Sequence, residues 1–409
     1  MNNQIYEVID TCRICGSREL SDVLDLTSQP PANSLYKPSE ETPPNAPLQL
    51  NFCDSCSAVQ LSATVDPDYL FNRYVWVTGT SKTAVEYSHF FAKEVIARCK
   101  KSTPSVLEVA SNDGTFLERF KELGCEILGV DPAQNIAAEA TSKGIPTVAD
   151  FFTEEVAEKL TIEHGKYDVV FARNVLPHVK AVHSVVAGIA VALQNDGLGV
   201  IEFHDAGLIL EELHYDSIYH EHLFLLSLKT IEHLLSGYGL KIFDLDKSPI
   251  SGGSWVIYVS HESQKKSQEL IKAELNETKI GVNTLDGWKK FALNAKSHAE
   301  ALKKIVCDSE EKLLAYGASA RSSTLLNFCG LSNEHIRAII DKNPLKVGLL
   351  TPGSNIPIIS YEEGLKQLLS HDKILLLAWN FKDEVIADLR EAGFKGQFIV
   401  PLPNKVHII

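Results

Sequence analysis

The chain has 409 residues, 44% of them hydrophobic, which is enough for two or three domains with separate cores. Asp and Glu (53) outnumber Lys and Arg (39), and the resulting net charge of −14 argues against a general nucleic-acid binder. The N-terminal residues lack the pattern of a signal peptide, and no apolar run is long enough to span a membrane. These features predict a soluble cytoplasmic protein without a nucleic-acid or membrane partner.

Four of the eight cysteines form two C-x-x-C pairs near the N-terminus. Four thiolates in two such pairs can surround one Zn²⁺ tetrahedrally, at about 2.3 Å each. Disulfides are uncommon in a chain without a secretion signal, and a redox pair needs only one C-x-x-C. Four protein ligands leave no open coordination position, so the pattern predicts a structural zinc site. Its ligands would be Cys12, Cys15, Cys53 and Cys56.

Residues 1–65 are short of apolar sequence and rich in turns, which suits a module held together by metal. Buried strands are then predicted at residues 105–109, 126–130, 168–173 and 198–203, with helical stretches between them. Strands alternating with helices favour a doubly wound parallel sheet with right-handed crossovers. We assign residues 66–261 to this Rossmann-like domain.

Residues 262–310 are charged, and their apolar positions recur at helical spacing from Leu285 to Ile305. This spacing predicts a long connecting helix with one buried face. A second strand–glycine–helix unit begins at Lys312, and strands are predicted at residues 336–340, 374–378 and 397–400. The fold class is therefore α/β, with a zinc module, a Rossmann-like domain and a second Rossmann-like α/β domain at residues 311–409.

Polar side chains follow the strands of the first domain. The turn after residue 109 has one glycine rather than G-x-G-x-x-G, so it supports a nucleoside better than a dinucleotide such as NAD. An acid at the end of the second strand can accept the ribose hydroxyls, and a later Asp-Phe pair suits an adenine. Each acid alone is more often a cap or a loop residue, but the series favours S-adenosylmethionine. The candidate cofactor residues are Glu108, Asn112, Gly114, Asp131, Asp150, Phe151 and Asn174.

Two further motifs follow the two C-x-x-C pairs along the chain. They are Tyr-His-Glu-His-Leu at residues 219–223 and Tyr-Gly-Ala-Ser-Ala-Arg-Ser at residues 316–322. With residues 75–82, 252–254 and 375–380, this arrangement resembles S-adenosylmethionine-dependent sugar C-methyltransferases over essentially the whole chain. Members of that family act on C-3 of nucleotide-linked 4-keto-deoxysugars. The resemblance implies that a base removes the proton beside the ketone, and that the enolate carbon attacks the sulfonium methyl.

The resemblance places the catalytic groups on the first of these motifs. His222 is the implied general base, since imidazole titrates near neutral pH, and His178 is the alternative base. Tyr219 is expected to hydrogen-bond the developing oxyanion, and Glu221 to fix either the substrate or the imidazole tautomer. A metal role is disfavoured, because His220 and His222 lack the i, i+4 spacing of a helical H-E-x-x-H site.

The resemblance assigns substrate binding to the C-terminal domain. A helix N-terminus with an adjacent cation suits a diphosphate, and Arg321 stands where the family more often has Lys. The alternative is a glycine turn that only packs helix against strand. The candidate substrate residues are Tyr74, Thr78, Ser81, Ser319, Arg321 and Asn380.

We therefore expect a monomeric methyltransferase with a sugar nucleotide bound between its parts. An O- or N-methyltransferase acting on a sugar nucleotide and an NAD-dependent sugar oxidoreductase remain alternatives, the latter disfavoured by the missing G-x-G-x-x-G. A non-catalytic zinc scaffold is a third, disfavoured by the polar residues at the strand ends. The nucleotide, the sugar and the stereochemistry at C-3 stay open.

Overall fold

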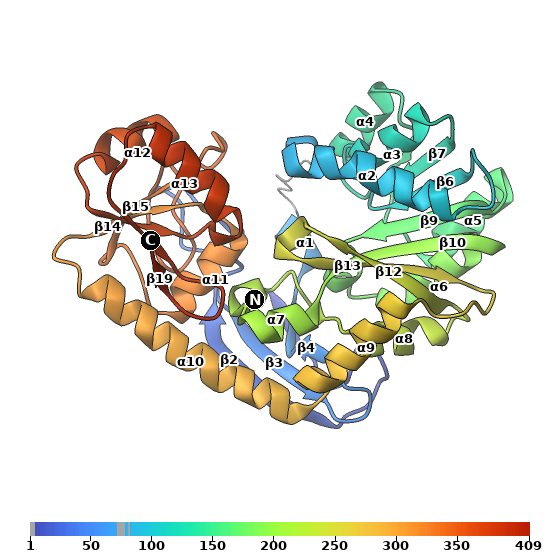
Figure 1. Ribbon diagram of the computed structural model, residues 1–409, viewed down its shortest axis with the longest axis horizontal. Helices are drawn as coiled ribbons and strands as arrows, with labels where there is room; N and C mark the ends of the chain where they lie inside the picture. Colours follow the sequence, from blue (N-terminus) through green and yellow to red (C-terminus); the bar gives the residue numbers. More distant parts are fainter. Residues whose placement is uncertain (1–4, 72–77, 81) are drawn as a thin grey trace.

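The computed structural model describes residues 5–71, 78–80 and 82–409. Two α/β lobes rise from a base formed by a small N-terminal sheet and the helices α9 and α10 (Figure 1). None of the helices in these ranges has the length and hydrophobicity that crossing a membrane requires. The α/β class and the three-part order predicted from the sequence are confirmed.

The N-terminal sheet is antiparallel, with the strand order β11-β4-β3-β2. Its fourth strand, β11, comes from residues 224–225, far inside the predicted second domain, so residues 1–65 do not form a closed unit. Leu24, Leu26, Leu48 and Leu50 on β2 and β3 are buried in the main core, where α10 packs against β2. The elements of this part are β1 (Tyr6–Val8), β2 (Leu20–Gln29), β3 (Ala46–Cys53), β4 (Val59–Leu61), β5 (Ala63–Val65), α1 (Pro67–Phe71) and β11 (Phe224–Leu225).

The central sheet has seven strands in the order β12-β13-β10-β9-β6-β7-β8. Strands β8, β7, β6, β9 and β10 run parallel, so their carboxyl ends meet at one edge, and β13 is antiparallel to both of its neighbours. The four predicted strands are present. The strands are β6 (Ser105–Val109), β7 (Glu126–Val130), β8 (Thr147–Val148), β9 (Tyr167–Arg173), β10 (Leu193–His204), β12 (Lys241–Ser248) and β13 (Ser254–Ser260).

Helices cover both faces of the central sheet. On one face, α2 and α3 bury an aromatic cluster that includes Phe91, Phe116, Phe120 and Phe171. On the other face, α5 and α6 pack into the core that continues into the N-terminal sheet. The helices are η1 (Thr78–Thr80), α2 (Lys82–Arg98), α3 (Thr115–Glu122), α4 (Gln134–Ser142), α5 (Glu154–His164), η2 (Leu176–His178), α6 (Val182–Ala192), α7 (Ala206–Glu212), η3 (Tyr215–Ser217), α8 (Leu228–Ser236) and η4 (Ile250–Gly252).

The connecting region contains two helices, α9 (Gln268–Ile280) and α10 (Leu285–Cys307), rather than the single helix expected for residues 262–310. Gly281 ends α9 in the left-handed conformation with φ 78°, which glycine adopts without a steric penalty. Thr284 then caps α10, because its side chain accepts a hydrogen bond from the backbone N–H of Gly287 at 3.1 Å. The apolar positions predicted from the spacing, such as Trp288 and Leu302, are buried as expected.

The C-terminal sheet has the order β16-β15-β14-β17-β18-β19, with only β19 antiparallel to its neighbour. The strand expected at residues 374–378 ends at Leu376, because the chain turns into a 3-10 helix around Trp379. The elements are β14 (Leu313–Tyr316), α11 (Ala320–Phe328), β15 (Ile336–Ile340), β16 (Ile358–Ile359), α12 (Tyr361–Leu368), β17 (Lys373–Leu376), η5 (Trp379–Phe381), α13 (Lys382–Glu391), β18 (Gln397–Val400) and β19 (His407–Ile408).

The two lobes share a local design at their first and second strands. In the central sheet, Asp131 after β7 accepts hydrogen bonds from the backbone N–H groups of Asn112 (2.8 Å) and Ala133 (2.9 Å). In the C-terminal sheet, Asp341 after β15 accepts from Ala318 (2.8 Å) and from the residue two positions after itself (2.8 Å). In both lobes, a carboxylate after the second strand therefore fixes the turn that leaves the first.

Candidate active site

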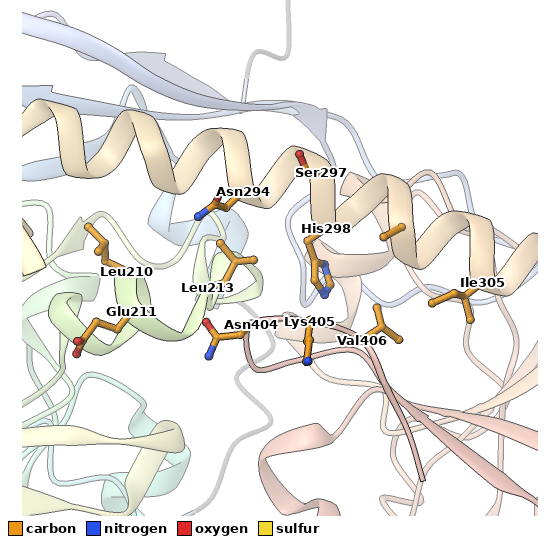
Figure 2. A pocket seen from close by; sticks show the side chains of 11 residues that line it. Leu210, Glu211, Leu213, Asn294, Ser297, His298, Ile305, Asn404, Lys405 and Val406 are labelled. Carbon is orange, nitrogen blue, oxygen red and sulfur yellow. The ribbon is translucent and has the colours of Figure 1, made fainter.

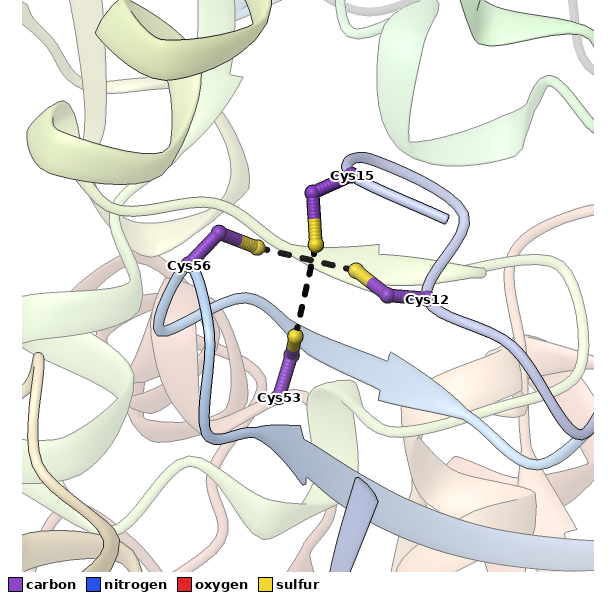
Figure 3. Close-up of side chains that lie close together, drawn as sticks. All are labelled: Cys12, Cys15, Cys53 and Cys56. Carbon is purple, nitrogen blue, oxygen red and sulfur yellow. Dashed lines mark hydrogen bonds between the residues drawn. The ribbon is translucent and has the colours of Figure 1, made fainter. Parts of the chain in front are cut away.

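The four cysteines of the predicted zinc site converge on one point (Figure 3). The Sγ atoms of Cys12 and Cys56 lie 3.6 Å apart, as do those of Cys15 and Cys53, and all four lie within 4.8 Å of one another. A tetrahedral zinc ion with bonds of 2.3 Å separates its sulfur ligands by about 3.8 Å, so the cluster fits this metal. All four ligand positions come from the protein, which makes the site structural.

The N-terminal sheet β11-β4-β3-β2, next to the zinc site, holds the turn that contains the predicted catalytic residues. We call residues 218–223 the His222 turn; it leads directly into β11, which pairs with β4. The backbone N–H of Leu61 donates to the carbonyl of Leu223 at 3.0 Å, and the buried ring of His220 donates through Nε2 to the carbonyl of Ala46 at 3.1 Å. His220 is therefore committed to holding the turn on β3.

Tyr219 and His222 form a hydrogen-bonded pair within this turn. Nδ1 of His222 lies 2.7 Å from the carbonyl oxygen of Ser217, and Nε2 lies 2.7 Å from the hydroxyl of Tyr219. A carbonyl oxygen only accepts, so Nδ1 carries the proton and Nε2 presents a lone pair that accepts from the phenol. The tautomer is thus set by Ser217 and not by Glu221, and it is the one that a general base requires.

His178, the alternative base, lies beside this pair. Its ring centroid is 4.8 Å from that of His222, and its ring hydrogen-bonds the backbone of Glu221. Burial lowers the pKa of His178 to about 4. Burial and the nearby His178 also lower the pKa of His222 well below its usual value. Both rings are therefore neutral near pH 7, so each retains an unprotonated nitrogen.

The side chain of Glu221 hydrogen-bonds a residue of the N-terminal part of the chain. Its Oε1 accepts a hydrogen bond of 2.7 Å from Nδ2 of Asn33, in the loop between β2 and β3. Burial raises the pKa of this carboxyl to about 7, and the Asn33 hydrogen bond opposes the rise. The structure thus pairs Glu221 with Asn33, and the substrate role expected for Glu221 stays a prediction.

The C-terminal lobe contacts η3, the short helix directly before the His222 turn, through Arg321. The guanidinium forms a bidentate pair with the buried Asp216, at 3.0 Å from Nε to Oδ2 and 2.9 Å from Nη2 to Oδ1. Trp379 donates to the same carboxylate at 2.8 Å, and its ring lies 4.6 Å from Cζ of Arg321. A Cβ added to Gly252 would lie 3.4 Å from Nη1 of Arg321 and 3.9 Å from Cβ of Asn380. Arg321, Asn380 and the Gly252 loop are therefore neighbours.

The remaining substrate candidates are Ser319, Thr78, Tyr74 and Ser81. Ser319 caps α11 by accepting from the backbone N–H of Ser322 at 3.2 Å, so its hydroxyl is engaged at the helix end. The backbone N–H of Thr78, on η1, donates to Oδ1 of Asn112 at 2.9 Å, so Thr78 lies beside the turn after β6. Tyr74 and Ser81 lie outside the residues that the structure describes.

The predicted cofactor residues gather at the carboxyl edge of the central sheet. The turn after β6 is tightly folded, and a Cβ added to Gly114 (φ 78°) would lie 2.8 Å from Ile145, so this position requires glycine. Glu108 is 4% exposed, and its Oε2 has no partner among the described residues. Burial raises the pKa of Glu108. An orphaned carboxylate oxygen beside a glycine turn is the environment that a nucleoside cofactor fits.

Three further cofactor candidates, Asn174, Asp150 and Phe151, lie along this edge. Asn174 follows β9 with φ 52°, and its N–H donates to the carbonyl of Glu202 at 2.7 Å. Asp150 follows β8 and accepts from the N–H of Phe151 at 2.8 Å. The Phe151 side chain is 62% exposed, which leaves its ring free to cover a flat ligand.

Three residues at this site were missed by the sequence analysis. Asn33 and Asp216 find their partners only through contacts between distant segments, for which no local pattern exists. His204 ends β10, where its buried Nε2 has no partner among the described residues, and burial lowers its pKa well below the usual value. A histidine directly after the predicted strand 198–203 was a signal that could have identified it.

A separate pocket of about 420 Å³ lies on another part of the molecule (Figure 2). It is bounded by α7, α10 and residues 404–406. Its histidine, His298, is fully engaged, with Nδ1 2.9 Å from the hydroxyl of Tyr215 and Nε2 2.7 Å from the carbonyl of Pro401. None of the predicted site residues lines this pocket, so it is not the candidate active site.

Comparison with known proteins bears on each part of the chain. Three family models match in succession: a zinc binding domain at residues 12–71, a methyltransferase domain at 84–245 and a C-methyltransferase C-terminal domain at 249–403. The C-methyltransferase NovU of Streptomyces niveus is 31% identical over 413 residues, covering 98% of this chain and 97% of that protein.

The similarity to solved structures is low. Magnesium protoporphyrin IX methyltransferase ChlM from Synechocystis PCC 6803, with bound SAM, is 14% identical, covering 43% of this chain and 78% of that chain with a TM-score of 0.33. The CcbJ methyltransferase from Streptomyces caelestis is also 14% identical, covering 48% of this chain and 96% of that chain with a TM-score of 0.35. On the strength of the full-length relative and the three family models, the chain belongs to the S-adenosylmethionine-dependent C-methyltransferases with an N-terminal zinc-binding domain and a C-terminal domain.

Proposed function

We propose that the enzyme methylates C-3 of a nucleotide-linked 4-keto-deoxysugar through an enolate. The observation that carries this proposal is the hydrogen-bonded series from Ser217 through His222 to Tyr219. It presents an unprotonated Nε2 and a phenol side by side, as removal of a proton beside a ketone requires. The Arg321–Asp216 ion pair, which joins the C-terminal lobe to η3, lies close enough to affect His222 electrostatically.

His222 acts as the base in this scheme. Nε2 accepts the proton from C-3, the C–H bonding pair moves toward C-4, and negative charge develops on the ketone oxygen. The resulting imidazolium keeps its Nδ1 hydrogen bond to the carbonyl of Ser217, which stabilises the positive charge. For Nε2 to accept this proton, the Tyr219 hydroxyl gives up its hydrogen bond to the same lone pair and donates to the developing oxyanion instead.

S-adenosylmethionine, when bound, supplies an electrophilic methyl group on a positively charged sulfur. We propose that Glu108, Asn112, Gly114, Asp131, Asp150, Phe151 and Asn174 hold it at the carboxyl edge of the central sheet. We also propose that Arg321, at the N-terminus of α11, holds the substrate diphosphate, and that Ser319, Asn380 and Thr78 contribute to the substrate site. Tyr74 and Ser81, outside the described residues, remain candidates from the sequence for the same site. The Asp216 carboxylate fixes the Arg321 fork, which orients the guanidinium toward the Gly252 loop.

Replacement of Asp131 is expected to weaken cofactor binding. In Asp131→Ala, the turn after β6 loses a carboxylate that accepts two backbone hydrogen bonds, and the ribose hydroxyls lose their acceptor. Hydrogen bonds to a charged group contribute roughly 1.5–3 kcal/mol, so we expect a dissociation constant for S-adenosylhomocysteine that is about 10- to 100-fold higher. Calorimetric titration measures it, with Glu139→Ala on the exposed face of α4 as the control. Unchanged affinity would contradict the assignment of Asp131.

The enolate is tested by hydrogen exchange. The enzyme is incubated in D₂O with S-adenosylhomocysteine and dTDP-, GDP-, CDP- and UDP-linked 4-keto-6-deoxysugars, and deuterium at C-3 is located by NMR. We expect enzyme-dependent exchange with at least one of them, and none with the corresponding sugar reduced at C-4, because only the ketone acidifies C-3. Methyl transfer to the same sugar without exchange at C-3 would exclude an enolate formed there.

A further inference from the structure

The loop between β2 and β3, at residues 30–45, contacts the candidate active site. Asn33 lies in this loop after β2, and its Nδ2 donates to Oε1 of Glu221 at 2.7 Å, across 188 positions of sequence. This distance is that of a well-formed hydrogen bond, between an exposed Asn33 and a half-buried Glu221. The zinc-binding domain thus supplies a side chain to the catalytic turn.

The position of Asn33 is fixed from two sides. Its loop forms a tight turn, in which Ser34 N–H donates to the carbonyl of Pro31 at 3.0 Å and Leu35 N–H donates to that of Asn33 at 2.8 Å. Three residues later, Tyr36 pairs with Leu350 of the C-terminal lobe in an antiparallel bridge. The Asn33 amide therefore stands on a loop held by both the N-terminal sheet and the C-terminal lobe.

The position of Glu221 is fixed by the same small sheet. The His222 turn is tied to β3 through the hydrogen bond from His220 to Ala46, and to β4 through β11. Both partners of the Asn33–Glu221 contact are consequently attached to strands next to the zinc site. Their separation depends on the geometry of that sheet.

The surroundings of Glu221 give the contact its chemical importance. The titratable groups around the turn are His178 on η2, His204 at the end of β10, and Tyr219, His220 and His222 within the turn itself, and the Arg321–Asp216 ion pair lies beside it. Burial lowers the pKa values of His178 and His220 to about 4 and that of His222 well below its usual value, so none of these rings offers a positive charge at neutral pH. Desolvation raises the pKa of Glu221 to about 7, and the Asn33 amide is the contact that opposes it.

We propose that Asn33 is a positioning residue of the active site, which orients Glu221 and favours its ionised, hydrogen-bond-accepting form. A carboxylate in this form can accept from a sugar hydroxyl, whereas a protonated carboxyl can do so less well. This consequence for catalysis rests on the proposed function, but the Asn33–Glu221 interaction itself does not. Asn33 would then link the zinc-binding domain to the protonation state of a group in the reaction site.

The experiment follows the titration of Glu221 directly. Full-length zinc-loaded protein is labelled with ¹³C at the Glu side-chain carboxyl, the Glu221 signal is assigned by its loss in Glu221→Gln, and its pKa is read by NMR from about pH 5 to about pH 10. In Asn33→Ala we expect the pKa of Glu221 to rise by about one unit, and in Asn33→Asp by more, because a second negative charge faces it. Ser34→Ala, in the same turn, is the matched control and is expected to leave the titration unchanged.

The catalytic consequence is measured with the sugar nucleotide that exchanges or accepts methyl. The acidic limb of the kcat/KM profile is expected to move to higher pH in Asn33→Ala by the same amount as the pKa of Glu221. An unchanged Glu221 titration in Asn33→Ala would overturn the proposal, as would a shifted titration with an unmoved acidic limb. A shifted titration in a protein that methylates none of the sugar nucleotides would contradict the proposed function while supporting the role of Asn33.

Discussion

The His222→Ala variant is expected to lose about 10²- to 10⁴-fold in the rate of methyl transfer, which is the usual contribution of a positioned general base. The Nε2 lone pair that accepts from Tyr219 disappears, and the phenol cannot replace it near pH 7. Cofactor binding should be retained, because His222 lies on the turn before β11 and not on the turn after β6. Initial rates with radiolabelled S-adenosylmethionine and calorimetry with S-adenosylhomocysteine measure the two quantities.

Two further variants identify the base. His164→Ala removes an exposed histidine at the end of α5 and should leave the rate unchanged. His178→Ala should reduce the rate less than His222→Ala, because His178 contacts the His222 ring rather than completing the pair with Tyr219. Full turnover in His222→Ala together with a large loss in His178→Ala would transfer the role of base to His178.

Removal of zinc is expected to abolish activity and lower the melting temperature. Structural zinc contributes on the order of 10 kcal/mol to the folding of small zinc domains, and here the metal joins two turns beside the sheet that contains β11. Loss of that sheet would release the His222 turn. Chelation followed by circular dichroism and a rate assay measures both effects, and added Zn²⁺ should restore them.

Cysteine variants separate the metal from general thiol chemistry. Cys53→Ser should reproduce the effect of chelation, because Cys53 is a buried member of the cluster. Cys307→Ser should not, since that exposed thiol lies at the end of α10 outside the cluster. A chelated protein that retained its melting temperature and its rate would show that the four thiols hold the fold without metal.

Much of the fold could be predicted from the sequence where local pattern determines structure. The strands at residues 105–109, 126–130 and 336–340 have the bounds that their apolar runs indicate, because buried parallel strands bury both faces. The zinc ligands were equally accessible, since the chemistry of two C-x-x-C pairs is local. The sequence pattern did not predict the break at Gly281, because the apolar positions at helical spacing belong to α10 and give no boundary for the residues before it.

The partners of the candidate site could not be read in the same way. Strand β11 has two residues and owes its existence to pairing with β4, which is more than 150 positions away. The bidentate contact of Arg321 with Asp216 and the contact of Asn33 with Glu221 likewise join segments 105 and 188 positions apart. Such pairs depend on tertiary packing, for which a single sequence contains no periodic signal.

Strand β11 belongs to the methyltransferase region of the chain but completes the N-terminal sheet by pairing with β4. This pairing limits how segments of related enzymes can be exchanged. A chimera that replaced residues 12–71 with those of a homologue would place a foreign β4 beside the resident β11. It would also replace the strand segment whose Ala46 carbonyl accepts the hydrogen bond from His220. The segment to exchange is therefore discontinuous. It comprises residues 6–71, since β1 pairs with β5, together with residues 218–225, and crossover sites for library construction belong outside both.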